Sequence, residues 1–168
     1  MSKIAVGSDI NSGDTAAGDG SGNDVINSKG GNDQNLGDSA SGQGSGNDII
    51  ASGEGGDVNW GDSLGDGSGN DVIASGEGGD ENYGDSSSGD GSGNDVIASG
   101  EGGDENYGDT RGGQGTGDDI IVSGEQDDTN TGNGGRDIFV CGGGEQDTVT
   151  DYNEEEGDIA TPDCENTS

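Results

Sequence analysis

The chain has 168 residues, of which only 22% are hydrophobic and 41 are glycine. Ordering the backbone costs roughly 1 to 2 kcal/mol per residue and a buried aliphatic side chain returns about 1.5 to 3 kcal/mol, so an ordinary hydrophobic core is excluded as the sole source of stability. The net charge of −33 excludes nucleic acid as a partner, because phosphate would be repelled. Composition alone is that of a disordered acidic segment, and a divalent cation or a basic partner must supply the missing free energy.

Residues 1–18 precede the first complete repeat. Ser8 to Asp14 match the second half of a repeat, so we expect this segment to form a partial first coil. Its apolar residues make no run long enough for a signal peptide or a membrane-spanning helix. We therefore expect no membrane insertion.

Residues 19–150 repeat with a nearly constant period. Each period contains two nonapeptides and a six-residue insert, for example Asp66 to Ala74, Ser75 to Tyr83 and Gly84 to Gly89. Successive copies begin 24, 23, 24 and 24 residues apart, at Gly20, Gly44, Gly67, Gly91 and Gly115. A disordered tail has no reason to keep this register, which is typical of stacked repeats.

The nonapeptides resemble the calcium-binding repeat of the RTX, or haemolysin-type, family, written G-G-x-G-x-D-x-U-x with U a large aliphatic residue. The resemblance covers twelve units between Asp19 and Thr150. It implies an all-β fold, a parallel β-roll or β-solenoid, in which six residues turn, three form a strand and two nonapeptides complete a coil. Calcium, which takes six to eight oxygen ligands, would bind between the turns of neighbouring coils as multiple ions.

The resemblance assigns calcium ligation to the sixth-position Asp of each nonapeptide. The first-edge column comprises Asp24, Asp48, Asp71, Asp95, Asp119 and Asp137. The second-edge column comprises Asp33, Asp57, Asp80, Asp104, Asp128 and Asp147. Gln126 and Glu145 replace the fourth glycine of two late units, which weakens the expectation of calcium near the C-terminus.

The inserts lengthen the first-edge turns from six to twelve residues and bring a third set of acids. This insert column, in which every Asp follows a Gly, comprises Asp14, Asp38, Asp62, Asp85 and Asp109. Its members are either additional calcium ligands or solvated turn residues, since Gly-Asp is common in turns. The sequence favours neither alternative.

The U position is Ile on one strand and Asn on the other. We expect both columns to point inward, with the stacked Asn amides hydrogen-bonded to one another; they comprise Ile26, Ile50, Ile73, Ile97 and Ile121, and Asn35, Asn59, Asn82, Asn106 and Asn130. The alternative is a second strand of opposite parity, which would turn Leu36, Trp60, Tyr83 and Tyr107 inward.

This parity gives the first strand a flat, mainly apolar outer face. The apolar strip comprises Val25, Ile49, Ala51, Val72, Ala74, Val96, Ala98, Ile120 and Val122. An apolar patch on a very acidic protein suggests a partner, so we expect a homodimer or self-assembly through this strip. The alternative is ice, by analogy with repetitive ice-binding solenoids, although Thr forms no column here.

Residues 151–168 break the pattern, and we expect them to form a C-terminal cap. Cys141 and Cys164 are the two cysteines, and a disulfide between them would pin the cap to the last coil; the alternative is two inert thiols. Calcium-loaded acidic repeats belong where calcium is millimolar, and such compartments are oxidising. We therefore expect an extracellular or cell-surface location.

Catalysis has little support in this sequence. The chain lacks His, and neither Cys lies beside a plausible base, so nucleophilic triads and zinc sites lack their parts. Pairs of acids recur in every coil, whereas an active site is normally unique. We expect a structural, adhesive or self-assembling module rather than an enzyme.

Overall fold

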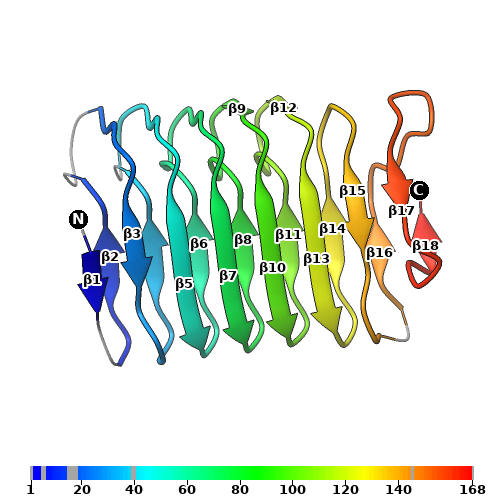
Figure 1. Ribbon diagram of the computed structural model, residues 1–168, viewed down its shortest axis with the longest axis horizontal. Coiled ribbons are helices and arrows are strands. Elements are labelled where there is room, and N and C mark those ends of the chain that lie inside the picture. Colours follow the sequence, from blue (N-terminus) through cyan, green and yellow to red (C-terminus); the bar gives the residue numbers. More distant parts are fainter. Residues whose placement is uncertain (1, 5–6, 15–18, 39–40, 145, 168) are drawn as a thin grey trace.

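The computed structural model describes residues 2–4, 7–14, 19–38, 41–144 and 146–167. This part of the chain is a parallel β-solenoid whose coils stack along one axis (Figure 1). Two eight-stranded parallel sheets face each other, and the chain alternates between them. The expected all-β solenoid with a 24-residue coil is confirmed.

The bounds of the strands follow the repeats. The first sheet contains β1 (Ser2–Ile4), β3 (Val25–Asn27), β5 (Ile49–Glu54), β7 (Val72–Glu77), β10 (Val96–Glu101), β13 (Ile120–Glu125), β15 (Ile138–Val140) and β17 (Ile159–Ala160). The second contains β2 (Ile10–Ser12), β4 (Gln34–Leu36), β6 (Val58–Trp60), β8 (Glu81–Tyr83), β11 (Glu105–Tyr107), β14 (Thr129–Thr131), β16 (Thr148–Val149) and β18 (Asn166–Thr167). Two short strands in the insert turns, β9 (Gly91–Ser92) and β12 (Gly115–Thr116), pair with each other.

Identical residues stack because the strands pair in register. Ile73 lies between Ile50 and Ile97, and the Ile column is at most 1% exposed. Phe139 continues this column in β15. The Ile column is therefore the main apolar part of the interior, on the side of the first sheet.

The Asn column is also buried, so the expected parity is confirmed and the alternative parity is wrong. Asn59 donates from Nδ2 to Oδ1 of Asn82 at 2.9 Å, and Asn82 donates to Asn106 at 3.0 Å. The second amide hydrogen is used by a buried Ser column that the sequence had not suggested: Asn82 Nδ2 also donates to Ser75 Oγ at 3.0 Å. The interior is thus half apolar and half a satisfied polar ladder.

The aromatic residues stack outside the Asn column. Tyr83 lies between Trp60 and Tyr107, with ring centroids 5.9 and 5.1 Å away. Tyr83 is only 3% exposed although it faces away from the Asn column, because a strand alternates its faces and its two neighbours cover both sides of the ring.

Four strands of the first sheet are six residues long, not the three that the resemblance implied. In β7, pairing resumes after Ser75, with Gly76 and Glu77 opposite Gly100 and Glu101 of β10. Gly76 has φ of 105°, in the left-handed region that glycine adopts without strain. The Ser-Gly-Glu sequence therefore turns the chain without leaving the sheet.

Both ends of the chain extend the sheets. The N-terminal segment contributes β1 and β2, one to each sheet. The C-terminal segment contributes β17 and β18, which pair with β15 and β16. Residues 151–167 therefore continue the solenoid.

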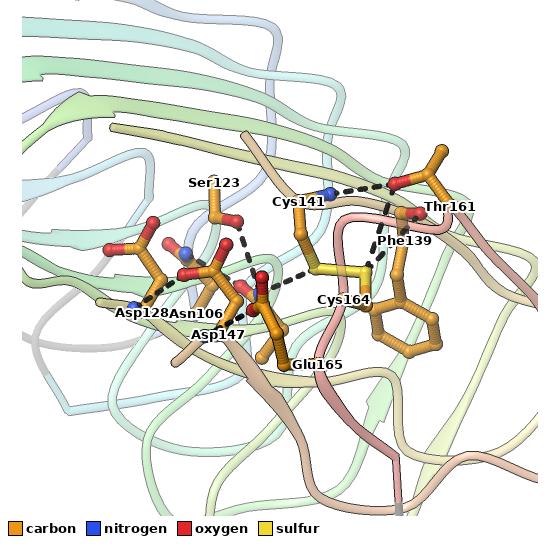
Figure 2. Close-up of a disulfide and its surroundings, with 10 residues drawn as sticks. Asn106, Ser123, Asp128, Phe139, Cys141, Asp147, Thr161, Cys164 and Glu165 are labelled. Atoms are coloured by element: carbon orange, nitrogen blue, oxygen red, sulfur yellow. Dashed lines mark hydrogen bonds between the residues drawn. A yellow bond between two sulfur atoms is a disulfide. The ribbon is translucent and has the colours of Figure 1, made fainter. Parts of the chain in front are cut away.

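The Cys141–Cys164 disulfide is present, as expected. It joins residues 23 apart in sequence, and Cys141 is buried beside Phe139 at the end of the Ile column (Figure 2). The Cys141 amide donates to Thr161 Oγ1 at 3.2 Å. The last coil is thus attached by a covalent bond, by strand pairing and by this hydrogen bond.

Candidate metal centre

The sixth-position acids lie where turns enter strands. In the first-edge column Asp48 precedes β5 and Asp71 precedes β7, and in the second-edge column Asp80 precedes β8. Asp24 is 6% exposed and the other eleven are at most 2% exposed. Two parallel rows of carboxylates therefore lie inside a protein with very few cationic side chains.

Eleven of the twelve carboxylates, those from Asp33 and Asp48 onward, have one oxygen that accepts a hydrogen bond from a backbone amide of the preceding coil. The Asp48 amide donates to Asp71 Oδ1 at 2.7 Å, and the Asp80 amide donates to Asp104 Oδ1 at 2.8 Å. The other oxygen accepts no hydrogen bond in most members, and these buried atoms are the Oδ2 atoms of Asp33, Asp48, Asp57, Asp71, Asp80, Asp95, Asp104, Asp119, Asp128 and Asp147. Buried polar atoms are rarely left without a partner, so these oxygens need a ligand.

The insert column is buried as well. Asp38, Asp62, Asp85 and Asp109 are all 0% exposed, so the alternative of solvated turn residues does not hold for these four. Asp14 is exposed. Neither carboxylate oxygen of Asp62, Asp85 or Asp109 accepts a hydrogen bond, which makes this column the most in need of a counter-charge.

The insert and first-edge columns converge into groups of three acids. In each group one oxygen per residue lies within 4.8 Å of the others, and the groups are Asp14–Asp24–Asp38, Asp38–Asp48–Asp62, Asp62–Asp71–Asp85 and Asp85–Asp95–Asp109. Among the described residues the second-edge column joins no such group. The sequence pattern is the same in the two sixth-position columns. In the described part of the structure, only the first-edge column lies close enough to the insert column to form groups of three acids.

Glycine is required beside these groups for lack of space. A Cβ on Gly91 would lie 2.8 Å from Asp85 Oδ2 and 2.9 Å from Asp109 Cβ, closer than real Cβ contacts. The first Gly of the Gly-Ser-Gly sequence therefore lets the backbone pass between successive insert carboxylates.

Burial and mutual repulsion raise the pKa of these acids. Burial, together with the neighbouring Asp62 carboxylate, raises the pKa of Asp71 to about 9. Burial, then the Asp95 and Asp62 charges, raises the pKa of Asp85 to about 11. On the second edge, burial raises the pKa of Asp80 to about 6 and that of Asp128 to about 7. A cation bound here would displace protons at neutral pH.

Three acids near the C-terminus extend the columns and were missed by sequence reasoning. The Asp137 amide donates to Asp158 Oδ1 at 2.9 Å, and the Asp147 amide donates to Glu165 Oε2 at 3.0 Å. Asp151 accepts from the Gly132 amide at 3.0 Å. Asp158 followed by Ile159 matches the Asp-Ile at Asp137 and Ile138 and was a usable signal for Asp158, whereas Glu165 had none.

The donor set suits a hard cation. All candidate ligand atoms are oxygens, the chain contains no His, and both cysteines are in the disulfide. Carboxylate, carbonyl and water ligands suit magnesium, calcium and manganese rather than thiolate-binding metals. The buried oxygens without hydrogen-bond donors therefore fit a hard divalent cation, a class that includes calcium.

No family model, curated protein or solved structure matches this chain. Within the described residues, no helix is long and apolar enough to cross a membrane. The fold and the acidic groups thus define the chain as a β-solenoid whose clustered carboxylates could hold metal ions.

Proposed function

We propose that this protein is a calcium-binding β-roll of the RTX type, which folds on calcium binding and acts outside the cell as a structural, adhesive or self-assembling module without catalytic activity. The observation that carries this proposal is the set of buried Asp groups whose oxygens have no donor. An uncompensated buried charge costs several kcal/mol even after relaxation.

Among the described side chains, the ion pairs of the two arginines do not involve these carboxylates. The chain has four basic residues against 37 acids. Arg111 pairs with Glu105 at 3.9 Å and Arg136 with Asp118 at 3.4 Å, and all four side chains are about half exposed. Four basic residues are too few for the buried acids, so most of the neutralising charge for the interior must come from bound ions or protons.

Calcium fits this site better than magnesium. Calcium accepts six to eight oxygens in flexible geometry, whereas magnesium demands a near-ideal octahedron and keeps several waters. Groups of three carboxylates lined by glycine-rich turns offer many oxygens from the protein. Millimolar extracellular calcium and the disulfide support a location outside the reducing cytosol.

Calorimetric titration of the chelated protein with calcium, and separately with magnesium, tests the metal assignment. We expect several calcium ions per chain and much weaker magnesium binding. Absence of calcium binding at millimolar concentration would refute the proposal.

The apolar strip supports a role in contact with another surface. Its larger side chains are 37% to 48% exposed, at Val25, Ile49, Val72, Val96 and Ile120. Sedimentation of the calcium-loaded protein and of its Val72→Lys/Val96→Lys variant tests self-assembly through this strip. We expect association that the variant abolishes; a monomer at all concentrations would argue against self-assembly.

Ice is the second candidate for this strip, because its side chains repeat at the coil spacing of about 4.8 Å on a regular outer face. A thermal hysteresis measurement on the calcium-loaded protein tests it directly. Hysteresis that Val72→Lys/Val96→Lys removes would support ice binding, and absence of hysteresis would exclude it.

A further inference from the structure

We infer that the insert column builds one continuous file of ion sites along the first edge, in which each insert carboxylate serves two neighbouring ions, and that Asn133 ends this file. This inference rests on the proposed function, but it concerns an arrangement that the nonapeptides alone do not contain, since every bridging residue belongs to an insert.

Successive acidic groups share their insert members. Asp38, Asp62 and Asp85 each belong to two successive groups, whereas Asp48, Asp71 and Asp95 each belong to one. Four groups are therefore linked end to end through the inserts. An ion in one group shares a ligand residue with an ion in the next.

The insert carboxylates also have the free oxygens that sharing requires. Asp62 and Asp85 have both oxygens buried without a hydrogen-bond partner, so each can offer one oxygen to either side. Asp71 has only Oδ2 free, because Oδ1 accepts from the Asp48 amide. At Asp38, Oδ1 is free while Oδ2 accepts from the Ser45 amide at 2.5 Å.

The file ends beyond Asp109. Asp109 has two free oxygens but, among the described residues, belongs to one group of acids, so its second oxygen lacks a further group to join. Asn133 occupies the next place in the column. A Cβ on Gly91 would meet Asp109 Cβ at 2.9 Å, and a Cβ on Gly115 would meet Asn133 Cβ at 2.5 Å.

Asn133 is unsuited to continue the file. It is neutral, and its one side-chain oxygen accepts from the Thr110 amide at 2.9 Å and from the Asp109 amide at 3.3 Å. Asp119 Oδ2 in the first-edge column remains free. The next site therefore has two of its three acids and lacks the third, at the coil where the inserts cease.

Ion counts in matched variants test the sharing. Calcium in the protein peak is measured by elemental analysis after gel filtration at a fixed, saturating free calcium concentration. We expect Asp85→Ala to lose two ions relative to wild type, because Asp85 belongs to two groups, and Asp95→Ala to lose one. The exposed neighbour Asp90→Ala is the control for removal of one charge and should lose none. Equal losses in Asp85→Ala and Asp95→Ala would overturn the sharing.

A gain of binding tests the end of the file without removing a ligand. Asn133→Asp should supply the missing third acid beside Asp109 and Asp119 and add one ion to the count. This variant keeps every wild-type carboxylate, so it remains informative if Asp85→Ala does not fold. An unchanged count would overturn the assignment of Asn133 as the end.

Different results would refute the proposed calcium binding and the proposed sharing of carboxylates between ions. Wild-type protein that binds no calcium would refute the proposed function and the file together. Wild-type protein that binds calcium, with equal losses in the two Ala variants, would refute only the shared file.

Discussion

At the scale of single residues, the buried Asn side chains show how a chain with few apolar residues makes an interior. An Asn amide has two donors and one acceptor group, and in this core both donors are used: Asn82 contacts Asn106 and Ser75, while its oxygen accepts from Asn59. Such a network is stabilising only when complete, because an unpartnered buried polar group costs about 1 to 3 kcal/mol.

Asn82→Ala should destabilise the calcium-loaded protein by about 3 kcal/mol, because it leaves Asn59 without its acceptor and Asn106 and Ser75 without their donor. The measurement is urea unfolding. Asn70→Ala, at an exposed position whose Oδ1 accepts from the Asn94 amide, is the control and should cost less than about 1 kcal/mol. Equal losses of stability in the two variants would mean that the buried Asn column stabilises the protein no more than an exposed Asn does.

Gly91→Ala should weaken calcium binding at the adjacent groups by about tenfold or more, equivalent to about 1.4 kcal/mol, because the new Cβ would crowd Asp85 and Asp109. Gly112→Ala is the matched control: its Cβ would meet only ordinary contacts, with Ser87 O at 3.5 Å the nearest. The measurement is calcium titration of both variants. Wild-type calcium affinity in Gly91→Ala would contradict the close approach of the Gly91 backbone to Asp85 and Asp109.

At the scale of strands and turns, regular spacing made much of this structure predictable. The stacking of identical residues, the inward Ile and Asn columns and the outward apolar strip all follow from a constant period and the alternation of strand faces. The Ser column was not predicted, since Ser75 in a Ser-Gly-Glu sequence looks like part of a turn, and it is buried only because Gly76 returns the chain to the sheet.

The acidic groups were only partly predictable. Position in the repeat identified Asp71 as a candidate ligand, but the burial of Asp62 depends on how the insert folds back over the edge, which the Gly-Asp sequence does not specify. The position of Asn133 could not be predicted for the same reason. Only the path of the chain places it after Asp109 in the insert column.

The C-terminal coil should depend on its disulfide. Closing a loop of this length is worth about 3 kcal/mol in the chain-entropy model, so Cys141→Ser/Cys164→Ser should lose about that much stability. Hydrogen exchange should show the largest loss of protection in β17 and β18, which pair with only one neighbouring strand each. Uniform loss along the solenoid would contradict a local role for the disulfide.

At the scale of the whole molecule, unbalanced negative charge is the main obstacle to folding. The net charge of −33 destabilises any compact state through self-repulsion, and the buried columns concentrate it. Ions that bind the folded chain better than the unfolded chain shift the equilibrium toward folding by mass action. Calcium concentration should therefore control whether the solenoid forms.

The metal-free protein should lose stability as pH rises. Burial raises the pKa of Asp48 to about 7 and of Asp71 to about 9, above the ordinary Asp value of about 3.9. Between about pH 4 and the raised pKa values, the folded state thus binds more protons than the unfolded state. The contribution of these protons to the free energy of unfolding is full below about pH 4 and is lost as pH rises through about 7 to 9. Far-ultraviolet circular dichroism in calcium-free buffers should show more β structure at about pH 5 than at about pH 8.5, and the opposite order would contradict these pKa shifts.

Far-ultraviolet circular dichroism of the exhaustively chelated protein at neutral pH, titrated with calcium and with magnesium as control, tests the central claim that bound calcium stabilises this fold. We expect a disordered spectrum that converts to β structure on addition of calcium and not of equal magnesium. A chelated protein that is already a folded β-solenoid at neutral pH would contradict this claim, because the Ile and Asn columns would then hold the coils together without any ion.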